Sequence, residues 1–146
     1  EISLGLVGSE MCIRDRFIPD MVAAKCGRIV TIVSDSGRVG EARMAVYASS
    51  KAGAQGFMRS IAKELGRYNV TANCVSLSAL LPDMPEEQRA EIMQSDHMKG
   101  LMGRYSIRRC GKSTDVAALV TFLCSDAAEW ITGQTYPLNG GYAPSM

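Results

Sequence analysis

Residues 27–51 read Gly27-Arg-Ile-Val-Thr-Ile-Val-Ser34-Asp-Ser-Gly-Arg-Val-Gly-Glu-Ala-Arg-Met-Ala-Val-Tyr47-Ala-Ser-Ser-Lys51, and this stretch decides the fold. Residues 28–33 form a short, nearly continuous apolar run rich in β-branched side chains, which is typical of a strand buried on both faces of a parallel sheet. Ser34 ends this strand, Tyr47 follows Ser34 by thirteen positions, and Lys51 follows Tyr47 by four. The stretch therefore predicts a buried strand, a polar loop over 34–43, and a helix that carries Tyr47 and Lys51.

The rest of the chain continues this alternation of helices and strands. The predicted elements are the end of a helix over 17–25, the strand 28–33, a helix over 44–68, a strand over Val70–Leu77, one or two short helices within 78–104 (Glu86–Gln94 is the better defined), a helix over 113–125 and a last strand over 134–138. A strand–helix–strand–helix–strand order implies a parallel sheet with right-handed crossovers. The fold class is therefore α/β, with three strands and flanking helices forming part of a Rossmann-like, doubly wound sheet.

Local sequence signals refine two of the predicted helices. Gly53 and Gly56 weaken the helix over 44–68 intrinsically, so we expect them to permit close packing against another helix or a strand. Ser113 or Thr114 is the expected N-cap of the helix over 113–125, with Asp115 in its first turn.

Composition is that of one ordinary globular domain. The 146 residues are 47% hydrophobic and 21% charged, with a formal net charge of +1. Bulk charge therefore gives no indication of a nucleic-acid or membrane partner, and no apolar run approaches the length of a membrane span. We expect neither kind of partner.

The cysteines and the single histidine limit the chemistry further. His97 is the only histidine, so a multi-histidine metal site and a Ser-His-Asp triad are both improbable, and we predict no metal site. The cysteines show no Cys-x-x-Cys spacing, and we interpret them as small buried apolar side chains in a reducing cytoplasm. The four cysteines interpreted in this way are Cys26, Cys74, Cys110 and Cys124, whereas the fifth, Cys12, lies within residues 1–16.

Residues 1–16 resemble a translated sequencing adapter. Their Leu-Val-Gly-Ser-Glu-Met-Cys-Ile-Arg-Asp run corresponds to a reading frame through the mosaic end used in transposase-based library preparation. The alternative is a genuine N-terminal segment such as a degenerate targeting peptide, but the segment lacks an adequate apolar region and a basic leader. We expect the native sequence to begin in mid-gene at Phe17 and residues 17–146 to belong to one domain.

Ser34, Tyr47 and Lys51 can together carry acid–base chemistry. Positions i and i+4 share a helix face, so Tyr47 and Lys51 should be neighbours. A nearby ammonium favours the phenolate, which would let Tyr47 take a proton from an alcohol or give one to a carbonyl oxygen. Ser34, at the carboxyl end of a parallel strand, could hydrogen-bond the same oxygen. The alternative is coincidence, since tyrosine and lysine four apart are common on helix surfaces.

From Gly27 onward the chain resembles the C-terminal half of the short-chain dehydrogenase/reductase family. The matching pieces are GRIVTIVS, Tyr47-Ala-Ser-Ser-Lys51-Ala-Gly, FMRSIAKELGRYNVTANCV, Arg109-Cys-Gly-Lys-Ser-Thr-Asp115-Val-Ala and the near-terminal Ile131-Thr-Gly133-Gln-Thr with Asn139-Gly-Gly141. The resemblance implies that residues 17–146 are the C-terminal part of a single Rossmann-like domain.

The resemblance also implies an activity, a cofactor and an assembly. Ser34 would position the substrate oxygen, Tyr47 would be the catalytic acid/base, and Lys51 would bind the nicotinamide ribose hydroxyls. The cofactor would be NAD or NADP. The loop at the end of the second strand, Leu77–Pro82, would flank its nicotinamide, and the residues in contact with the cofactor would be Tyr47, Lys51, Leu77, Ser78 and Leu80. The substrate would be a small carbonyl or alcohol compound, with a 3-oxoacyl thioester as one candidate. The intact protein would be a cytoplasmic homodimer or homotetramer, with the Tyr47 helix packed against its symmetry mate.

Three features depart from the family pattern. The Gly-rich dinucleotide turn does not occur in the sequence, and the asparagine that completes the family's tetrad would lie upstream of Phe17. The usual Pro-Gly after the second strand is Leu77-Ser78, and the following threonine position is Pro82. The alternative reading is therefore a truncated, non-catalytic fragment that keeps only oligomerisation helices and half an active site. In such a fragment the strand over 28–33 would expose an apolar edge.

Two further sets of residues leave alternatives open. The methionine cluster (Met84, Met93, Met98 and Met102) is either core packing or an adaptable cover over a substrate pocket. Arg108 and Arg109 either bind a phosphate-bearing substrate or are solvated or structural arginines, and the second reading is favoured.

Overall fold

The computed structural model describes residues 16–144, and its centre is a three-stranded parallel sheet. Strand β1 (Gly27–Ser34) pairs with β2 (Val70–Leu77), and β2 pairs with β3 (Thr135–Leu138), giving the order β1-β2-β3. The register sets Ser34 opposite Leu77, and Leu77 opposite Leu138, so all three strands end at one edge. The α/β class and the parallel sheet predicted from the sequence are confirmed.

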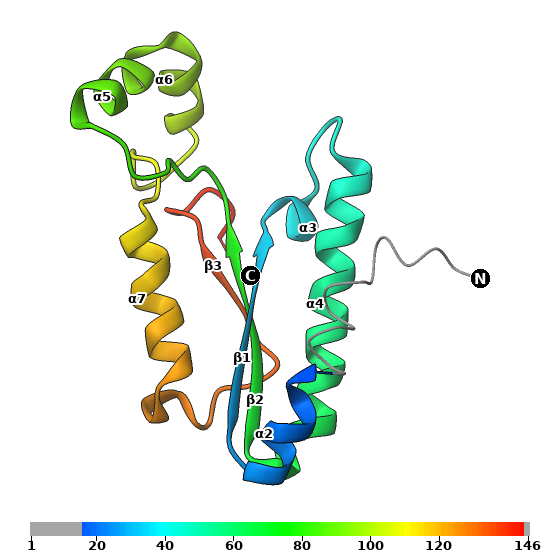
Figure 1. The fold of residues 1–146 in the computed structure, drawn as a ribbon. Coiled ribbons are helices and arrows are strands. Elements are labelled where there is room, and N and C mark those ends of the chain that lie inside the picture. The colour runs from blue at the N-terminus through cyan, green and yellow to red at the C-terminus, as the bar shows by residue number, and fades with distance from the viewer. Residues whose placement is uncertain (1–15, 145–146) are drawn as a thin grey trace.

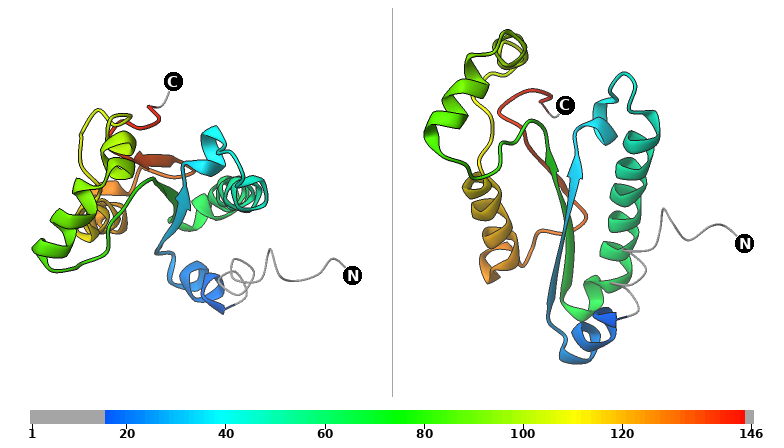
Figure 2. Two further views of the ribbon diagram at one scale, coloured as in Figure 1. Left: turned by 90° about the horizontal axis from the view of Figure 1, so that it is seen from above. Right: turned by 45° about the horizontal axis from the view of Figure 1, so that its top comes forward.

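Helices cover both faces of this sheet (Figure 1). Helix α4 (Ala45–Leu65) lies on one face and α7 (Ser113–Cys124) on the other, and Figure 2 shows the sheet between them from two further directions. Short helix α2 (Ile18–Ala24) precedes β1 at the amino end of the strands. The residues predicted as the adapter, apart from Arg16, lie outside the described residues.

Two apolar cores hold the layers together. On the α4 side, Met58, Ile61 and Leu65 pack with β1 and β2 side chains, and Phe57 is half-buried against them. On the α7 side, Leu123 packs against Val75 of β2. Strand β2 is buried along almost its whole length, as expected for the central strand of a doubly covered sheet.

A separate lobe lies beyond the carboxyl ends of the strands. It contains α5 (Glu86–Gln94) and α6 (Asp96–Met102), which follow β2. Buried Met102 and Cys110 form its small core, against which Met93 and Met98 pack. Core packing is thus the observed role of these three methionines, whereas Met84 does not belong to the cluster.

Several local predictions need correction. The loop over 34–43 contains a short helix, α3 (Ser36–Val39), and the last turn of the long helix is a separate 3-10 helix (Gly66–Tyr68). Neither Ser113 nor Thr114 caps α7; the N-cap is Lys112, whose backbone N–H donates to the Asp115 carboxylate at 2.8 Å. Cys74 and Cys110 are buried as predicted, but Cys26 and Cys124 are exposed.

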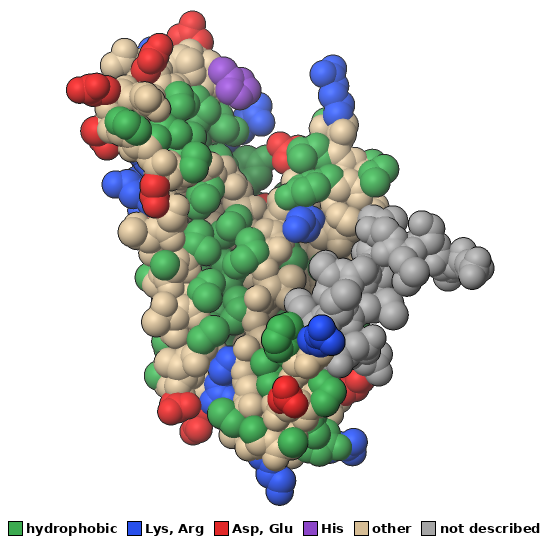
Figure 3. Space-filling view, in the orientation of Figure 1, with side chains coloured by type: hydrophobic (Ala, Val, Ile, Leu, Met, Phe, Trp, Pro, Cys, Tyr) green, Lys and Arg blue, Asp and Glu red, His purple; other side chains and the backbone are tan. Residues whose placement is uncertain are grey.

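Strand β1 is the edge of the described sheet, since β2 is its only partner among residues 16–144. Ile32 on this strand is 42% exposed. Apolar side chains gather along the visible face of the molecule over β1 and α7 (Figure 3). Within the described part of the chain, no helix is both long and apolar enough to cross a membrane.

Candidate active site at the carboxyl ends of the strands

Ser34 and Tyr47 meet at one cavity. Ser34 is the last residue of β1, and Tyr47 lies in the first turn of α4. Both line a cavity of about 240 Å³ together with Leu77, the last residue of β2, and Ser78, which follows it. Tyr47 is 43% exposed. The carboxyl ends of parallel strands are where ligands bind in open α/β sheets.

Lys51 lies one helical turn beyond Tyr47. Its Nζ is 5.8 Å from the centroid of the Tyr47 ring and donates to the Ile32 carbonyl oxygen at 3.5 Å. The ammonium therefore sits beside the Tyr47 ring and the end of β1, while the lining of the Ser34–Tyr47 cavity does not include it. The structure thus brings Lys51 next to Tyr47 rather than into the cavity itself.

Gly37 sets how closely α3 approaches this part of α4. A Cβ built on Gly37 would lie 2.8 Å from the Ala52 nitrogen and 2.9 Å from the Lys51 carbonyl carbon. Backbone cannot yield as a flexible side chain can, so only glycine permits this contact. Gly37 was predicted to lie in a loop, and this packing role was not predicted from the sequence.

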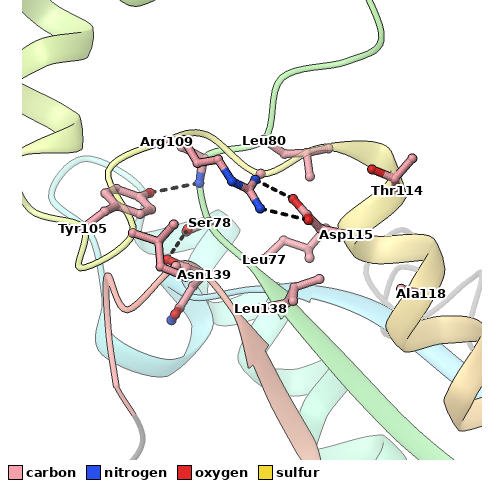
Figure 4. A pocket seen from close by; sticks show the side chains of 14 residues that line it. Leu77, Ser78, Leu80, Tyr105, Arg109, Thr114, Asp115, Ala118, Leu138 and Asn139 are labelled. Carbon is pink, nitrogen blue, oxygen red and sulfur yellow. Dashed lines mark hydrogen bonds and ion pairs between the residues drawn. The ribbon is translucent and has the colours of Figure 1, made fainter.

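A second cavity, of about 360 Å³, lies on the other side of the loop after β2. Its lining includes Leu80 as well as Leu77 and Ser78, so the predicted nicotinamide-flanking residues line two adjoining cavities rather than one. The loop is held in place: the Ala79 N–H donates to the Tyr105 hydroxyl at 3.0 Å, and the Ser78 hydroxyl donates to the Asn139 carbonyl at 3.4 Å (Figure 4). Residues 77–79 and Tyr105 form the wall between the cavities.

Arg109 forms an ion pair at the rim of the second cavity. Its guanidinium donates to both Asp115 carboxylate oxygens, at 2.7 and 3.0 Å, as Figure 4 shows. Hydrogen bonds from Arg109 and the Lys112 N–H lower the pKa of Asp115 to about 2, and the same pair raises the pKa of Arg109. This bidentate contact supports the structural interpretation of Arg109, because the guanidinium already has a carboxylate partner.

A buried carboxylate, not predicted from the sequence, follows Ser34 directly in the chain. Asp35 is 2% exposed and accepts hydrogen bonds from the Ser76 hydroxyl at 2.7 Å, from Arg38 at 2.8 Å and from the Asn139 amide at 2.5 Å. Its N–H donates to the Leu77 carbonyl at 2.9 Å. The network joins the ends of β1, β2 and β3 and so fixes the backbone that carries Ser34.

The chemistry available at this site is acid–base and hydrogen-bonding chemistry. No group of three His, Cys, Asp or Glu side chains within residues 16–144 is arranged to hold a metal ion. Burial raises the pKa of the thiols of Cys74 and Cys110, which keeps both protonated and poorly nucleophilic. A serine and a tyrosine hydroxyl facing one cavity, with an ammonium beside the tyrosine, suit a substrate with an alcohol or carbonyl oxygen.

Comparisons with known proteins agree with this reading. A family model described as Enoyl-(Acyl carrier protein) reductase matches residues 7–143. The chain is 38% identical over 125 residues to the 3-oxoacyl-[acyl-carrier-protein] reductase FabG of Pseudomonas aeruginosa, an alignment covering 83% of the chain and 47% of that protein. A solved structure titled "Dehalogenation enzyme" superposes with a TM-score of 0.85 at 34% identity, covering 94% of the chain and 57% of that structure.

A second solved structure is titled YwfH, an NADPH dependent reductase involved in bacilysin biosynthesis. It superposes with a TM-score of 0.82 at 25% identity, covering 97% of the chain and 56% of that structure. The chain thus spans about half the length of the curated relatives it matches.

Proposed function

Because the chain belongs to the short-chain dehydrogenase/reductase family, we propose that the protein carrying it is an NAD(P)-dependent oxidoreductase that interconverts a secondary alcohol and a ketone. The observation that carries this proposal is the cavity shared by Ser34 and Tyr47 at the carboxyl ends of the strands, with Lys51 beside Tyr47. The substrate is a small molecule that offers one oxygen to both hydroxyls.

The residues present fit the nicotinamide end of such a cofactor. The Lys51 ammonium and the Tyr47 hydroxyl supply donors suited to ribose hydroxyls, and apolar Leu77 and Leu80 offer surface to a flat ring. Ser78 adds a hydroxyl at the wall between the two cavities. A bound nicotinamide would supply or accept the hydride. The choice between NAD and NADP depends on residues that bind the adenosine ribose, which the matched motifs do not include.

Tyr47 is the proposed acid/base. In alcohol oxidation its oxygen takes the proton of the substrate hydroxyl, and in ketone reduction its hydroxyl gives that proton back. The Lys51 ammonium lies 5.8 Å from the centroid of the Tyr47 ring, where its charge can attract the negative charge that develops on the Tyr47 oxygen during proton transfer. Ser34 hydrogen-bonds the same substrate oxygen and keeps it within reach of Tyr47.

Substrate class and assembly follow the relatives. The P. aeruginosa relative is named a 3-oxoacyl-[acyl-carrier-protein] reductase, so we propose a 3-oxoacyl thioester as the first substrate to test. Self-association through α4 is supported by Val46, which is exposed, and by Gly53, whose Cβ position is open within the chain. The close packing expected at Gly53 and Gly56 is not found among the described residues: a Cβ at Gly53 would meet nothing within 4 Å, and one at Gly56 would meet the Arg59 side chain of the same helix at 3.7 Å. Cytoplasmic location remains part of the proposal.

Replacement of Tyr47 tests the proposal. In the protein at its full natural length, Tyr47→Phe should lower turnover by about 100-fold or more, the range typical of a lost acid/base group, while the variant still binds the cofactor. Tyr68→Phe is the matched control, because Tyr68 lies at the opposite end of α4 and should leave turnover unchanged. Turnover retained in the Tyr47 variant would reject the assigned role.

A second candidate is a chain that lacks catalysis and serves only in oligomer packing. Two observations favour it: the chain spans 47% of its P. aeruginosa relative, and the Gly-rich phosphate-binding turn does not occur in its sequence. Titration of the 146-residue polypeptide with NADH and NADPH separates the candidates. Saturable binding at micromolar concentration would contradict this second candidate.

A further inference from the structure

The Ser34 hydroxyl continues into a short chain of hydrogen bonds that ends in a carboxylate. Its Oγ donates to the Ser36 Oγ at 3.2 Å, and the Ser36 hydroxyl donates to Glu41 Oε2 at 3.0 Å. The Ser36 N–H also donates to the Ser34 Oγ at 3.2 Å. Ser36 is buried, and Glu41 lines the same cavity as Ser34 and Tyr47. We refer to Ser34, Ser36 and Glu41 as the hydroxyl relay.

The carboxylate gives the relay a direction. An ionised carboxylate only accepts hydrogen bonds, and each serine hydroxyl has a single hydrogen to donate. Ser36 must therefore use its hydrogen on Glu41 and can only accept from Ser34. Ser34 in turn uses its hydrogen on Ser36 and one lone pair on the Ser36 N–H. What Ser34 presents to the cavity is its remaining lone pair.

The local backbone fixes the relay in this arrangement. The Asp35 carbonyl accepts from the N–H groups of Arg38 and Val39 at 2.8 and 2.9 Å, which forms α3. Gly40 ends α3 with φ at +74°, a left-handed conformation that favours glycine. The chain then turns back, and the Glu41 carboxylate reaches Ser36. The buried Asp35 side chain holds the start of this turn against β2.

We propose that Glu41, acting through Ser36, is a positioning residue that sets Ser34 to accept rather than donate a hydrogen bond at the substrate oxygen. This inference rests on the proposed function, in which Ser34 contacts that oxygen. Glu41 does not touch the substrate. It affects the relative affinity of the site for the alcohol and for the ketone.

The alcohol and the ketone place different demands on Ser34. In an unreactive complex in which Tyr47 keeps its hydrogen and donates it to the substrate oxygen, an alcohol can donate its own hydrogen to the free lone pair of Ser34 and leave the relay intact. A ketone oxygen only accepts, so Ser34 must withdraw its hydrogen from Ser36 before it can bind the ketone. One hydrogen bond of this kind corresponds to about a threefold to tenfold difference in affinity. The relay thus favours the alcohol form over the ketone form by that factor.

The test compares the dissociation constants of a ketone and of its alcohol in their unreactive ternary complexes, for the protein at full natural length. Glu41→Gln keeps the shape of the side chain but can donate as well as accept, so the direction is no longer imposed. Ser36→Ala removes the acceptor for Ser34 altogether. In both variants the ratio of ketone to alcohol dissociation constants should fall about threefold to tenfold.

Matched controls distinguish the relay from structural damage. Glu64→Gln, on the exposed surface of α4, should leave both dissociation constants unchanged. A variant that merely disturbs the loop would weaken both ligands together and leave the ratio unchanged, and that result would overturn the inference. Should Tyr47→Phe abolish turnover while the ratio stays constant in both relay variants, the relay fails and the proposed function stands. Should Tyr47→Phe retain turnover, the proposed function itself fails.

Discussion

Replacement of Asp35 by alanine should be among the most destabilising single changes at this end of the sheet. The carboxylate is 2% exposed and accepts three side-chain hydrogen bonds, from Ser76, Arg38 and Asn139. Alanine would leave the buried Ser76 hydroxyl without its acceptor and would remove one acceptor from the Asn139 amide. Asn139 and Arg38 would each keep the Ala143 carbonyl, which limits their part of the loss.

The magnitude follows from these contacts. A buried donor without a partner costs about 1–3 kcal/mol, and breaking a buried charge pair costs about 3–5 kcal/mol. Since Arg38 and Asn139 both keep the Ala143 carbonyl as an acceptor, we expect Asp35→Ala to lower the free energy of unfolding by about 3–5 kcal/mol out of the roughly 5–15 kcal/mol typical of a domain. Asp35→Asn should cost about 1–3 kcal/mol, because its amide oxygen can still accept from Ser76 and its NH2 group would face the Asn139 amide.

Guanidinium chloride unfolding followed by far-ultraviolet circular dichroism measures this free energy. Fluorescence of Trp130, the only tryptophan, is unsuitable because that side chain is 96% exposed in the folded chain. Asp126→Ala is the control, since its carboxylate is exposed and makes only a 3.5 Å contact with Arg28. A loss below about 1 kcal/mol for Asp35→Ala, or equal losses at both positions, would refute the assigned role of the buried network.

Three further predictions test other features of the chain. Gly37→Ala should lower the unfolding midpoint because its Cβ meets the backbone of α4, whereas Gly100→Ala, within α6 and with open space around it, should preserve or raise that midpoint; the reverse order would contradict the close approach at Lys51. Asp115→Asn should destabilise the fold at neutral pH, because a carboxylate whose folded pKa is held at about 2 contributes stability above its ordinary pKa and loses it as the pH falls through 2. The variant and the parent should therefore converge in stability in strong acid, and a difference that persists below pH 2 would exclude the ion pair as its cause. Thiol labelling of the native chain, mapped by mass spectrometry, should modify the exposed Cys26 and Cys124. It should spare Cys74 and Cys110, whose thiols are buried and have a raised pKa.

The strands and the long helices were predictable because their signals are local. The apolar run over 28–33 and the strand at Val70–Leu77 each carry their own burial pattern, and the structure places both in the sheet. Tyr47 and Lys51 were predictable as neighbours for the same reason, because residues four positions apart on a helix lie on the same face.

The errors arose where a residue's environment depends on distant parts of the chain. Cys124 belongs to an apolar helix, but it is the last residue of α7 and lies on the exposed side, a placement set by how α7 docks on the sheet. Asp35 is buried because Ser76 and Asn139, which lie 41 and 104 positions away, donate to it. No periodic pattern carries that information. An aspartate directly after a strand-ending serine was the only local signal, and it is equally typical of an exposed turn.

A double-mutant cycle on Ser34 and Tyr47 tests the central claim most directly. Both hydroxyls line one cavity and are proposed to act on one substrate oxygen, so the effects of removing them should not be independent. In ketone reduction by the protein at full natural length, Ser34→Ala should lower turnover strongly in the parent and much less in the Tyr47→Phe background. Losses that multiply in full would show that the two hydroxyls act at separate places and would contradict the account.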